Sequence, residues 1–264
     1  MPYTISHTAA VLPFSRWLKP RRLLSAAVIG SMVPDFGYLL PHRPLHAETH
    51  SLHGLFTLCV PVGLACYWLF QWLIKPAGLE ALPDGAYARA RPVAASARIG
   101  AGRDWLRAAV GVFAGAVTHL VWDGFTHEGA RGVQMFPSLA DTYGDVVGHR
   151  IVMYAILQQL SSLAGLAVVF FVAWRALAAP GPTPPPERRL ARAERTAWGI
   201  AYPAFALFAS AVLLAVSGLG IGLHAWLDST AIAVLRGLAV AAVAVSAALR
   251  LRLRHVPRGP SIAR

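Results

Sequence analysis

The chain has 264 residues, of which 56% are hydrophobic and only 14% charged, and it carries 24 Lys and Arg against 12 Asp and Glu. Its mean hydropathy is +0.52. These values exclude an ordinary cytosolic enzyme and a disordered chain, and two cysteines exclude a secreted disulfide scaffold.

The apolar residues lie in long runs, each near the roughly 20 residues that a helix needs to cross a bilayer. The runs cover residues 55–74, 108–122, 151–174, 197–227 and 231–249. The sequence therefore predicts an all-α, multi-pass integral membrane helical bundle, with about six transmembrane helices plus a short N-terminal helix. The start, MPYTISHTAAVLPF, lacks a basic segment and a long apolar stretch, so we expect insertion through internal spans rather than a cleaved signal peptide.

In chain order, the expected helices cover residues 5–18, 23–40, 49–74, 107–126, 151–178, 195–217 and 231–252. The first extends only about 21 Å at 1.5 Å per residue, so we do not expect it to cross fully. The segment 180–186, PGPTPPP, cannot be helical. It predicts three parts: a membrane bundle over residues 1–178, a Pro-rich linker over 179–194, and a C-terminal helical hairpin with a basic tail over 195–264.

The basic residues form four clusters, which this helix map places on one side of the membrane. They lie in residues 16–22, 75–107, 175–195 and 250–264. The positive-inside rule makes that side cytoplasmic, so the C-terminus and the 76–106 and 179–194 loops should face the cytoplasm. The 42–54 and 127–150 loops should then face outside. Nucleic acid is not an expected partner, because the clusters lie beside spans and lack interleaved aromatics.

The same map separates the histidines, although it was drawn from Lys and Arg alone. Only His255 falls on the cytoplasmic side, whereas the outer half or outer loops receive His7, His42, His46, His50, His53, His119, His127, His149 and His224. Imidazoles gathered on one side indicate a functional site there.

Hairpin geometry predicts a first pair of site residues. His7 and Asp35 each lie 14 residues from Arg21, near the expected turn, so both side chains should return to the same depth, about 21 Å from it. An acid at membrane depth needs a partner or a metal. The alternative is a lone Asp that caps a kink next to Pro34.

A second set lies in VTHLVWDGFTH, where His119, Asp123 and His127 follow at i, i+4 and i+8 on one helix face. This spacing lets a His nitrogen and an Asp oxygen reach one divalent ion. His119 and Asp123 should lie about 18 and 24 Å above Arg107, near the level of the first pair. His127 is a candidate substrate-binding residue. Separate hydrogen-bonded His–Asp pairs without metal are the alternative.

The third set lies in HAETHSLHGLF, where His50 is the best candidate ligand and Thr49 or Ser51 can cap the following helix. Glu48 and His53 are the candidate catalytic groups that move a proton, although Glu48 can also simply face water. His42 and His46 are expected in the loop.

In the 127–150 loop, which we expect to lie on the outer leaflet, Arg131 and Arg150 are candidates for binding a substrate phosphate or carboxylate. Ordinary interfacial anchoring is the alternative for both arginines.

The segments SHTAAVLPF, GSMVPDFGYLL, THSLHGLF…PVGL and THLVWDGFTHEG, in this order, resemble the bacterial membrane-protein family called domain of unknown function 4184. More distantly, they resemble the inner-membrane metal-dependent-hydrolase-like proteins. That resemblance implies a metal set of His7, Asp35, His50, His119 and Asp123. The sequence departs from the hydrolase-like pattern before Thr49, where His46-Ala47-Glu48 replaces a His-Arg-Gly, and this bears on substrate handling more than on metal binding.

Together these observations predict a membrane-embedded metal-dependent hydrolase of the bacterial plasma membrane. It would hold a divalent metal, most simply zinc, and act on a lipid or lipid-linked substrate at the outer face. The alternative is a non-enzymatic membrane protein, either a metal or proton transporter or an assembly factor, that uses the same His/Asp cluster.

Overall fold

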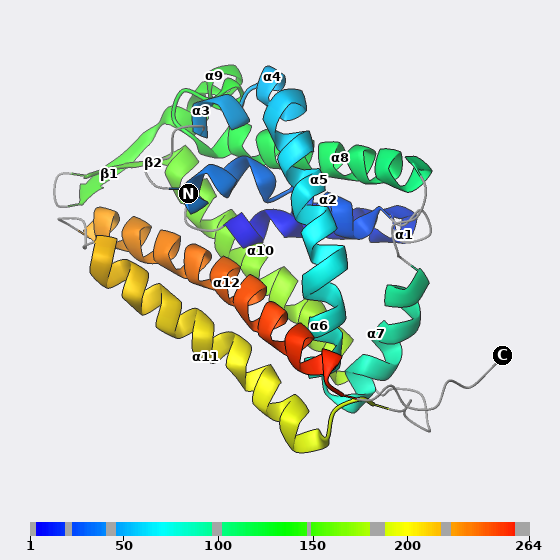
Figure 1. Cartoon of the computed structure of the whole chain (residues 1–264). Helices are drawn as coiled ribbons and strands as arrows, with labels where there is room; N and C mark the ends of the chain where they lie inside the picture. Colours follow the sequence, from blue (N-terminus) through cyan, green and yellow to red (C-terminus); the bar gives the residue numbers. More distant parts are fainter. Residues whose placement is uncertain are drawn as a thin grey trace. The chain divides into compact units, whose positions relative to one another are not determined.

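Figure 1 shows a computed structural model of the chain, which describes residues 4–18, 23–40, 46–96, 102–146, 149–179, 188–217 and 223–256. Helices make up nearly all of it, which confirms the all-α class. Within the described residues, five helices are long and apolar enough to cross a membrane: Leu52–Ala81, Gly102–Thr126, Met153–Ala178, Arg192–Val216 and Ser229–Arg254. The chain is thus a helical membrane protein.

The residues group into two compact units, each assembled from separate stretches of chain. The first, here called the N-terminal unit, comprises Tyr3–Ala65 and Ala101–Val172. The second, here called the C-terminal unit, comprises Cys66–Gly100 and Ala173–Arg264. The predicted three-part division follows chain order instead. Its Pro-rich segment, 180–186, lies outside the described residues, so the linker stays a prediction.

The predictions of continuous helices over 5–18 and 23–40 are wrong. The first segment consists of the 3-10 segments η1 (Thr4–Ala10) and η2 (Leu12–Phe14) and the short helix α1 (Ser15–Leu18). The second consists of α2 (Leu24–Gly30), a turn, and the 3-10 segment η3 (Val33–Leu39). Pro13 and Pro34 lie in the first turns of η2 and η3, where their missing N–H groups interrupt an α-helical ladder.

Helix α8 (Gly102–Thr126) packs closely on α2, because glycines line the contact. A Cβ added at Gly115 would lie 2.0 Å from the Ala27 carbonyl oxygen, and one at Gly30 would lie 2.1 Å from that of Val112. Small residues permit such close approach of membrane helices. The contact holds the last turns of α8, with their polar residues, against the turn that leads into η3.

The rest of the N-terminal unit includes short elements around α8. The described segment 46–96 begins with α3 (His46–Thr49) and α4 (Leu52–Gly54), and α4 leads into the π-helical turn η4 (Leu55–Cys59) and then α5 (Val60–Leu69). After α8 come α9 (Arg131–Met135), the 3-10 segment η6 (Pro137–Ala140), and an antiparallel hairpin of β1 (Thr142–Val146) and β2 (His149–Val152). The expected 127–150 loop is therefore structured. Its position on a leaflet stays a prediction.

The C-terminal unit is built on long helices. The π-helical turn η5 (Phe70–Ile74) continues α5 and leads into α6 (Lys75–Ala81), which is followed by α7 (Asp84–Ser96). Helix α10 (Met153–Ala178) has its last turns here, and α11 (Arg192–Ser217) packs on α12 (Leu223–Arg254). The helices predicted over 107–126, 151–178, 195–217 and 231–252 are confirmed, with bounds shifted by up to eight residues.

Candidate metal centre

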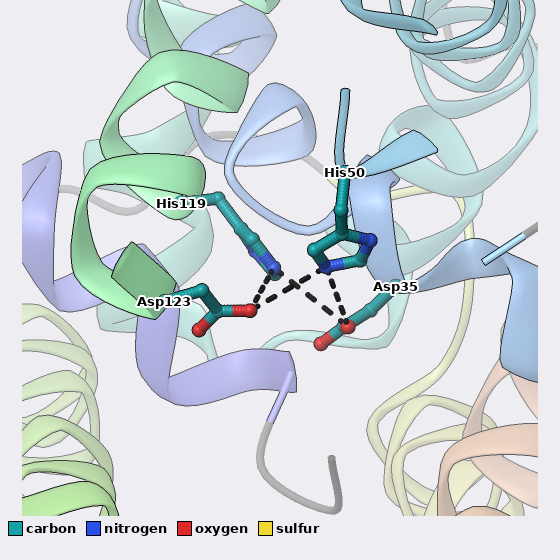
Figure 2. A group of neighbouring side chains, drawn as sticks. All are labelled: Asp35, His50, His119 and Asp123. Carbon is teal, nitrogen blue, oxygen red and sulfur yellow. Dashed lines mark ion pairs between the residues drawn. The ribbon is translucent and has the colours of Figure 1, made fainter. Parts of the chain in front are cut away.

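Four ionisable side chains from three segments converge in the N-terminal unit (Figure 2). Asp35 comes from η3, His50 from the turn between α3 and α4, and His119 and Asp123 from the last turns of α8. Each offers one donor atom, and the four atoms lie within 4.8 Å of one another. Asp35 and His119 are completely buried, Asp123 is 6% exposed, and His50 is partly buried. The predicted convergence of His50, His119 and Asp123 with Asp35 is confirmed.

The spacing of the donor atoms matches the edges of a metal polyhedron. His119 Nε2 lies 3.2 Å from Asp123 Oδ2 and 3.7 Å from Asp35 Oδ1. His50 Nε2 lies 3.4 Å and 3.8 Å from the same two oxygens. Ligands at about 2.0–2.2 Å from a tetrahedral ion are about 3.3–3.6 Å apart. The four spacings lie within about 0.2 Å of tetrahedral edges, and all four atoms lie within 4.8 Å of one another, so the group is spaced like the ligands of a single ion.

The protonation of His119 is set by its other ring nitrogen. Nδ1 lies 2.8 Å from the carbonyl oxygen of Ser31, and a carbonyl can only accept, so Nδ1 carries the proton that it donates. In a neutral imidazole, Nε2 then presents a lone pair to the two carboxylates. A His ligand whose second nitrogen donates to a backbone carbonyl is the usual arrangement around metals.

His50 has the same tautomer for a related reason. The single hydroxyl proton of Thr49 is donated to the carbonyl oxygen of Pro34 at 2.8 Å. Thr49 Oγ1 can therefore only accept from His50 Nδ1, which lies 3.2 Å away. His50 Nε2 is left with its lone pair directed at Asp35 and Asp123, as for His119.

This donor set fits a divalent metal ion. Two imidazole lone pairs and two carboxylates face one another, and like groups at such distances repel unless a cation lies between them. Within the described residues, Asp35 Oδ1, His119 Nε2 and both oxygens of Asp123 are buried without a hydrogen bond. Buried polar atoms are normally satisfied, so these four atoms indicate a ligand. Nitrogen and oxygen donors of this kind suit first-row divalent ions.

His7 lies beside this group but on a different oxygen of Asp123. Its ring stacks on that of His119 at 3.8 Å between centroids, and its Nε2 lies 3.6 Å from Asp123 Oδ1. Burial, together with the neighbouring His119, lowers the pKa of His7 to about 3, so the imidazole is neutral. The carboxylate contact described for His7 is with Asp123, whereas hairpin symmetry predicted that His7 and Asp35 share an ion or a hydrogen bond. The role of His7 as a ligand stays a prediction.

Thr4 is a site residue that the sequence analysis missed. It is 1% exposed, and its hydroxyl donates to Asp35 Oδ2 at 2.8 Å. This bond holds the carboxylate so that Oδ1 turns toward the two histidines. A hydroxyl one 3-10 turn before His7 was the available signal.

A cavity of about 800 Å³ adjoins the centre and is lined by both His50 and Asp123. Two of the three candidate substrate-binding residues, His127 and Arg131, also line it. His127 is fixed at both nitrogens, because Nδ1 donates to the Asp123 carbonyl at 3.1 Å and Nε2 lies 3.0 Å from the amide nitrogen of Gln158.

The structure does not bring the other predicted groups to this cavity. Glu48 and His53 are exposed and absent from its described lining, as is Arg150, which is exposed on β2. The reason lies at Ser51, whose extended backbone interrupts the helix and whose side chain accepts from Gly54 N. The i, i+3 spacing from His50 to His53 therefore no longer places both on one face. Glu128, which the sequence analysis did not select, lines the cavity instead.

Several other predicted positions fall outside the description. His42 lies outside the described residues, and the side chains of His46, His149 and His224 are likewise not described.

Comparison with known proteins identifies one family. The family described as Domain of unknown function (DUF4184) matches residues 1–247. The chain belongs to this family. No curated protein and no solved structure matches the chain. The match includes all four residues of the converging group.

Proposed function

We propose that this DUF4184 protein is a membrane-embedded metal-dependent hydrolase that acts on a lipid or lipid-linked substrate at the outer face of a bacterial plasma membrane. One observation carries the proposal: two imidazole lone pairs and two carboxylates meet at one buried point, beside a cavity large enough for part of a lipid. The charge distribution along the sequence supports the outward orientation.

Asp35, His50, His119 and Asp123 would hold the ion, for which zinc suits the mixed nitrogen and oxygen donors. Such an ion, when bound, supplies a Lewis acid that polarises the scissile group and activates water. Thr4 orients Asp35 through its hydrogen bond. His7 supports the buried ring of His119 by stacking.

The cavity walls suggest how the substrate would bind. Arg131 lines the cavity and would bind a phosphate or carboxylate of the substrate. Glu128, also on the wall, would accept the proton released from water, the role that the sequence had assigned to Glu48 or His53. Leu52 and Val121 also line it and are 65% and 57% exposed, so the wall continues onto the apolar outside of the unit. An acyl or prenyl chain could enter from there.

An activity assay on detergent-purified protein tests this proposal. The zinc-loaded chain is incubated with a panel of bacterial phospholipids and prenyl phosphates, and released products are measured by mass spectrometry. We expect cleavage of one class, loss of cleavage with chelator and in Asp123→Ala, and full cleavage in Asp104→Asn, a control on the same helix outside the centre. Cleavage of no class, or cleavage that persists in Asp123→Ala, would refute the hydrolase.

The transporter alternative gives a different result in the same preparation. A transporter would move zinc or protons across proteoliposomes and leave every lipid intact. An ion flux that Asp123→Ala abolishes, without any lipid cleavage, would replace the proposed activity.

Cysteine labelling of intact cells tests the orientation. A cysteine placed at Ser138, which is exposed after α9, should react from outside, whereas one at Ala90 on α7 should not. The reverse pattern would place the cavity on the cytoplasmic side.

A further inference from the structure

A second cavity, of about 600 Å³, lies wholly within the C-terminal unit and has no role in the proposed hydrolysis. Its walls come from the end of α5, η5, α6, α7 and the last turns of α12. The side chains that carry the argument are those of Trp68, Gln71, Trp72, Lys75, Arg91 and Arg250.

The cavity carries net positive charge. Lys75, Arg91 and Arg250 line it, and Glu80 is the acidic residue among its described lining. Glu80 Oε2 lies 3.9 Å from Arg188 Nε, so a cation outside this lining already balances it. The described lining therefore holds more cationic than acidic side chains.

Contacts with backbone carbonyls position two of these cations. Lys75 Nζ donates to the carbonyl of Ala94 at 3.2 Å. Arg250 donates to the carbonyl of Trp72, and its guanidinium lies over the Trp72 ring at 4.1 Å from the centroid. A guanidinium has five N–H donors, so Arg250 retains donors for an anion.

Gln71 provides an independent indication of a ligand. Its amide nitrogen and oxygen are both buried without a hydrogen bond in the described part of the chain. A buried amide that lines a cavity is satisfied when a ligand supplies the partner. An anion that accepts from the amide nitrogen would fill this role.

The position of the cavity along the helices indicates the kind of anion. Lys75 and Arg250 lie near the ends of the candidate spans Leu52–Ala81 and Ser229–Arg254. Trp68 and Trp72 stack in parallel with ring centroids 5.3 Å apart, and they are 46% and 45% exposed. Tryptophan and basic residues at the end of a span are typical of the headgroup region. Basic pockets between helices at this depth bind anionic headgroups.

We propose that this cavity binds the phosphate group of an anionic phospholipid, with Arg250, Lys75 and Arg91 as the cationic ligands and Gln71 as a hydrogen-bond donor. Free inorganic phosphate has the same anionic chemistry, and the experiment below distinguishes the two sources. The proposal does not depend on the hydrolase, because it uses no residue of the metal centre.

Equilibrium titration of the delipidated full chain in detergent tests this site. The probes are dihexanoyl phosphatidylglycerol, dihexanoyl phosphatidylcholine and inorganic phosphate. We expect phosphatidylglycerol to bind most tightly, and Arg250→Gln to weaken it about tenfold, as for loss of one charge-assisted contact. Arg91→Gln, at an exposed side chain, should weaken it about threefold without affecting folding.

Arg254→Gln is the matched control, because it removes the same charge one helical turn away and outside the described lining. It should change the affinity less than about twofold. Equal losses in Arg254→Gln and Arg250→Gln would mean nonspecific surface attraction and overturn the site. Equal affinity for phosphatidylglycerol and phosphatidylcholine would also overturn it. Competition by phosphate at similar affinity, with the same Arg250 dependence, would retain the anion site but reject the lipid.

Discussion

The contacts of α2 with α8 and of α11 with α12 are both built on small residues, but they differ in their polar groups. Gly115 and Gly30 bring α2 against α8, and a Cβ added at Gly237 on α12 would meet Ser210 Oγ of α11 at 2.1 Å. Just beyond the first contact, α8 carries the buried residues His119 and Asp123. In the second, the ion pair of Arg252 with Glu194 is well exposed.

The two contacts also differ in whether their polar groups have hydrogen-bond partners within the protein. In the α11–α12 contact, Tyr202 Oη lies 2.9 Å from Ser246 Oγ, and Ser210 donates to the carbonyl of Ala206 at 2.6 Å. These hydroxyls are satisfied within the protein, so the contact needs no ligand. The oxygens of Asp123 lack such partners in the described residues. Close packing therefore stabilises the fold in both places. Next to the α2–α8 contact, however, α8 also supplies polar groups that can bind a ligand.

The largest effect should come from filling the α2–α8 contact. Gly115→Ala places a Cβ against the backbone of α2, and we expect a loss of about 3 kcal/mol in unfolding free energy, since overpacking forces backbone shifts. Retained metal should fall as well, because His119 and Asp123 follow on the same helix. Denaturant unfolding and metal analysis of the purified variant measure both quantities.

Gly237→Ala sharpens the comparison, since it should destabilise the α11–α12 contact yet leave the metal content unchanged. Gly102→Ala is the control on α8, because a Cβ there meets nothing within 4 Å. Equal metal loss in Gly115→Ala and Gly237→Ala would show that the α11–α12 contact affects metal binding as strongly as the α2–α8 contact does.

Asp123→Asn should separate metal binding from packing. It keeps the side-chain shape but removes a charged ligand, so we expect a folded protein with metal content near zero. At a metal concentration 100 times Kd, binding stabilises the wild type by about 3 kcal/mol. Chelator should therefore lower the Tm of the wild type and leave that of Asp123→Asn unchanged. A wild-type Tm insensitive to chelator would favour the metal-free His–Asp network.

The sequence predicted the centre more fully than the fold around it. His119 and Asp123 could be predicted because an i, i+4 pair in an apolar helix has a defined depth and face. The contact of His7 with Asp123 was not predicted, because the depth count assumed continuous α-helices, whereas the 3-10 segments rise about 2.0 Å per residue. The break at Ser51 is local, because its hydroxyl donates to the Glu48 carbonyl and accepts from the Gly54 amide. The sequence offered Ser51 as a cap, but Thr49 was an equal candidate, so the position of the break and the exposure of Glu48 and His53 were not predicted.

A smaller effect is expected at the residue that orients Asp35. Thr4→Val removes the hydroxyl that donates to Asp35 Oδ2 and keeps the branched shape of the side chain. Loss of such an outer hydrogen bond typically lowers metal affinity by about 10- to 100-fold. Competition with a metal indicator dye measures the affinity, and Thr4→Ser should restore most of it. An unchanged affinity in Thr4→Val would mean that Asp35 does not bind the metal through the oriented carboxylate.

The smallest effect should occur in the α11–α12 contact, where polar groups are already paired. Tyr202→Phe removes the hydrogen bond to Ser246 without opening a cavity, and we expect a loss of about 1 kcal/mol in unfolding free energy. Ser246→Ala should cost a similar amount, and the double variant little more, because both changes delete the same bond. Metal content and chelator sensitivity should equal those of the wild type in all three. A change in metal affinity here would mean that the α11–α12 contact is coupled to the centre, and the distinction between a structural and a ligand-binding contact would fail.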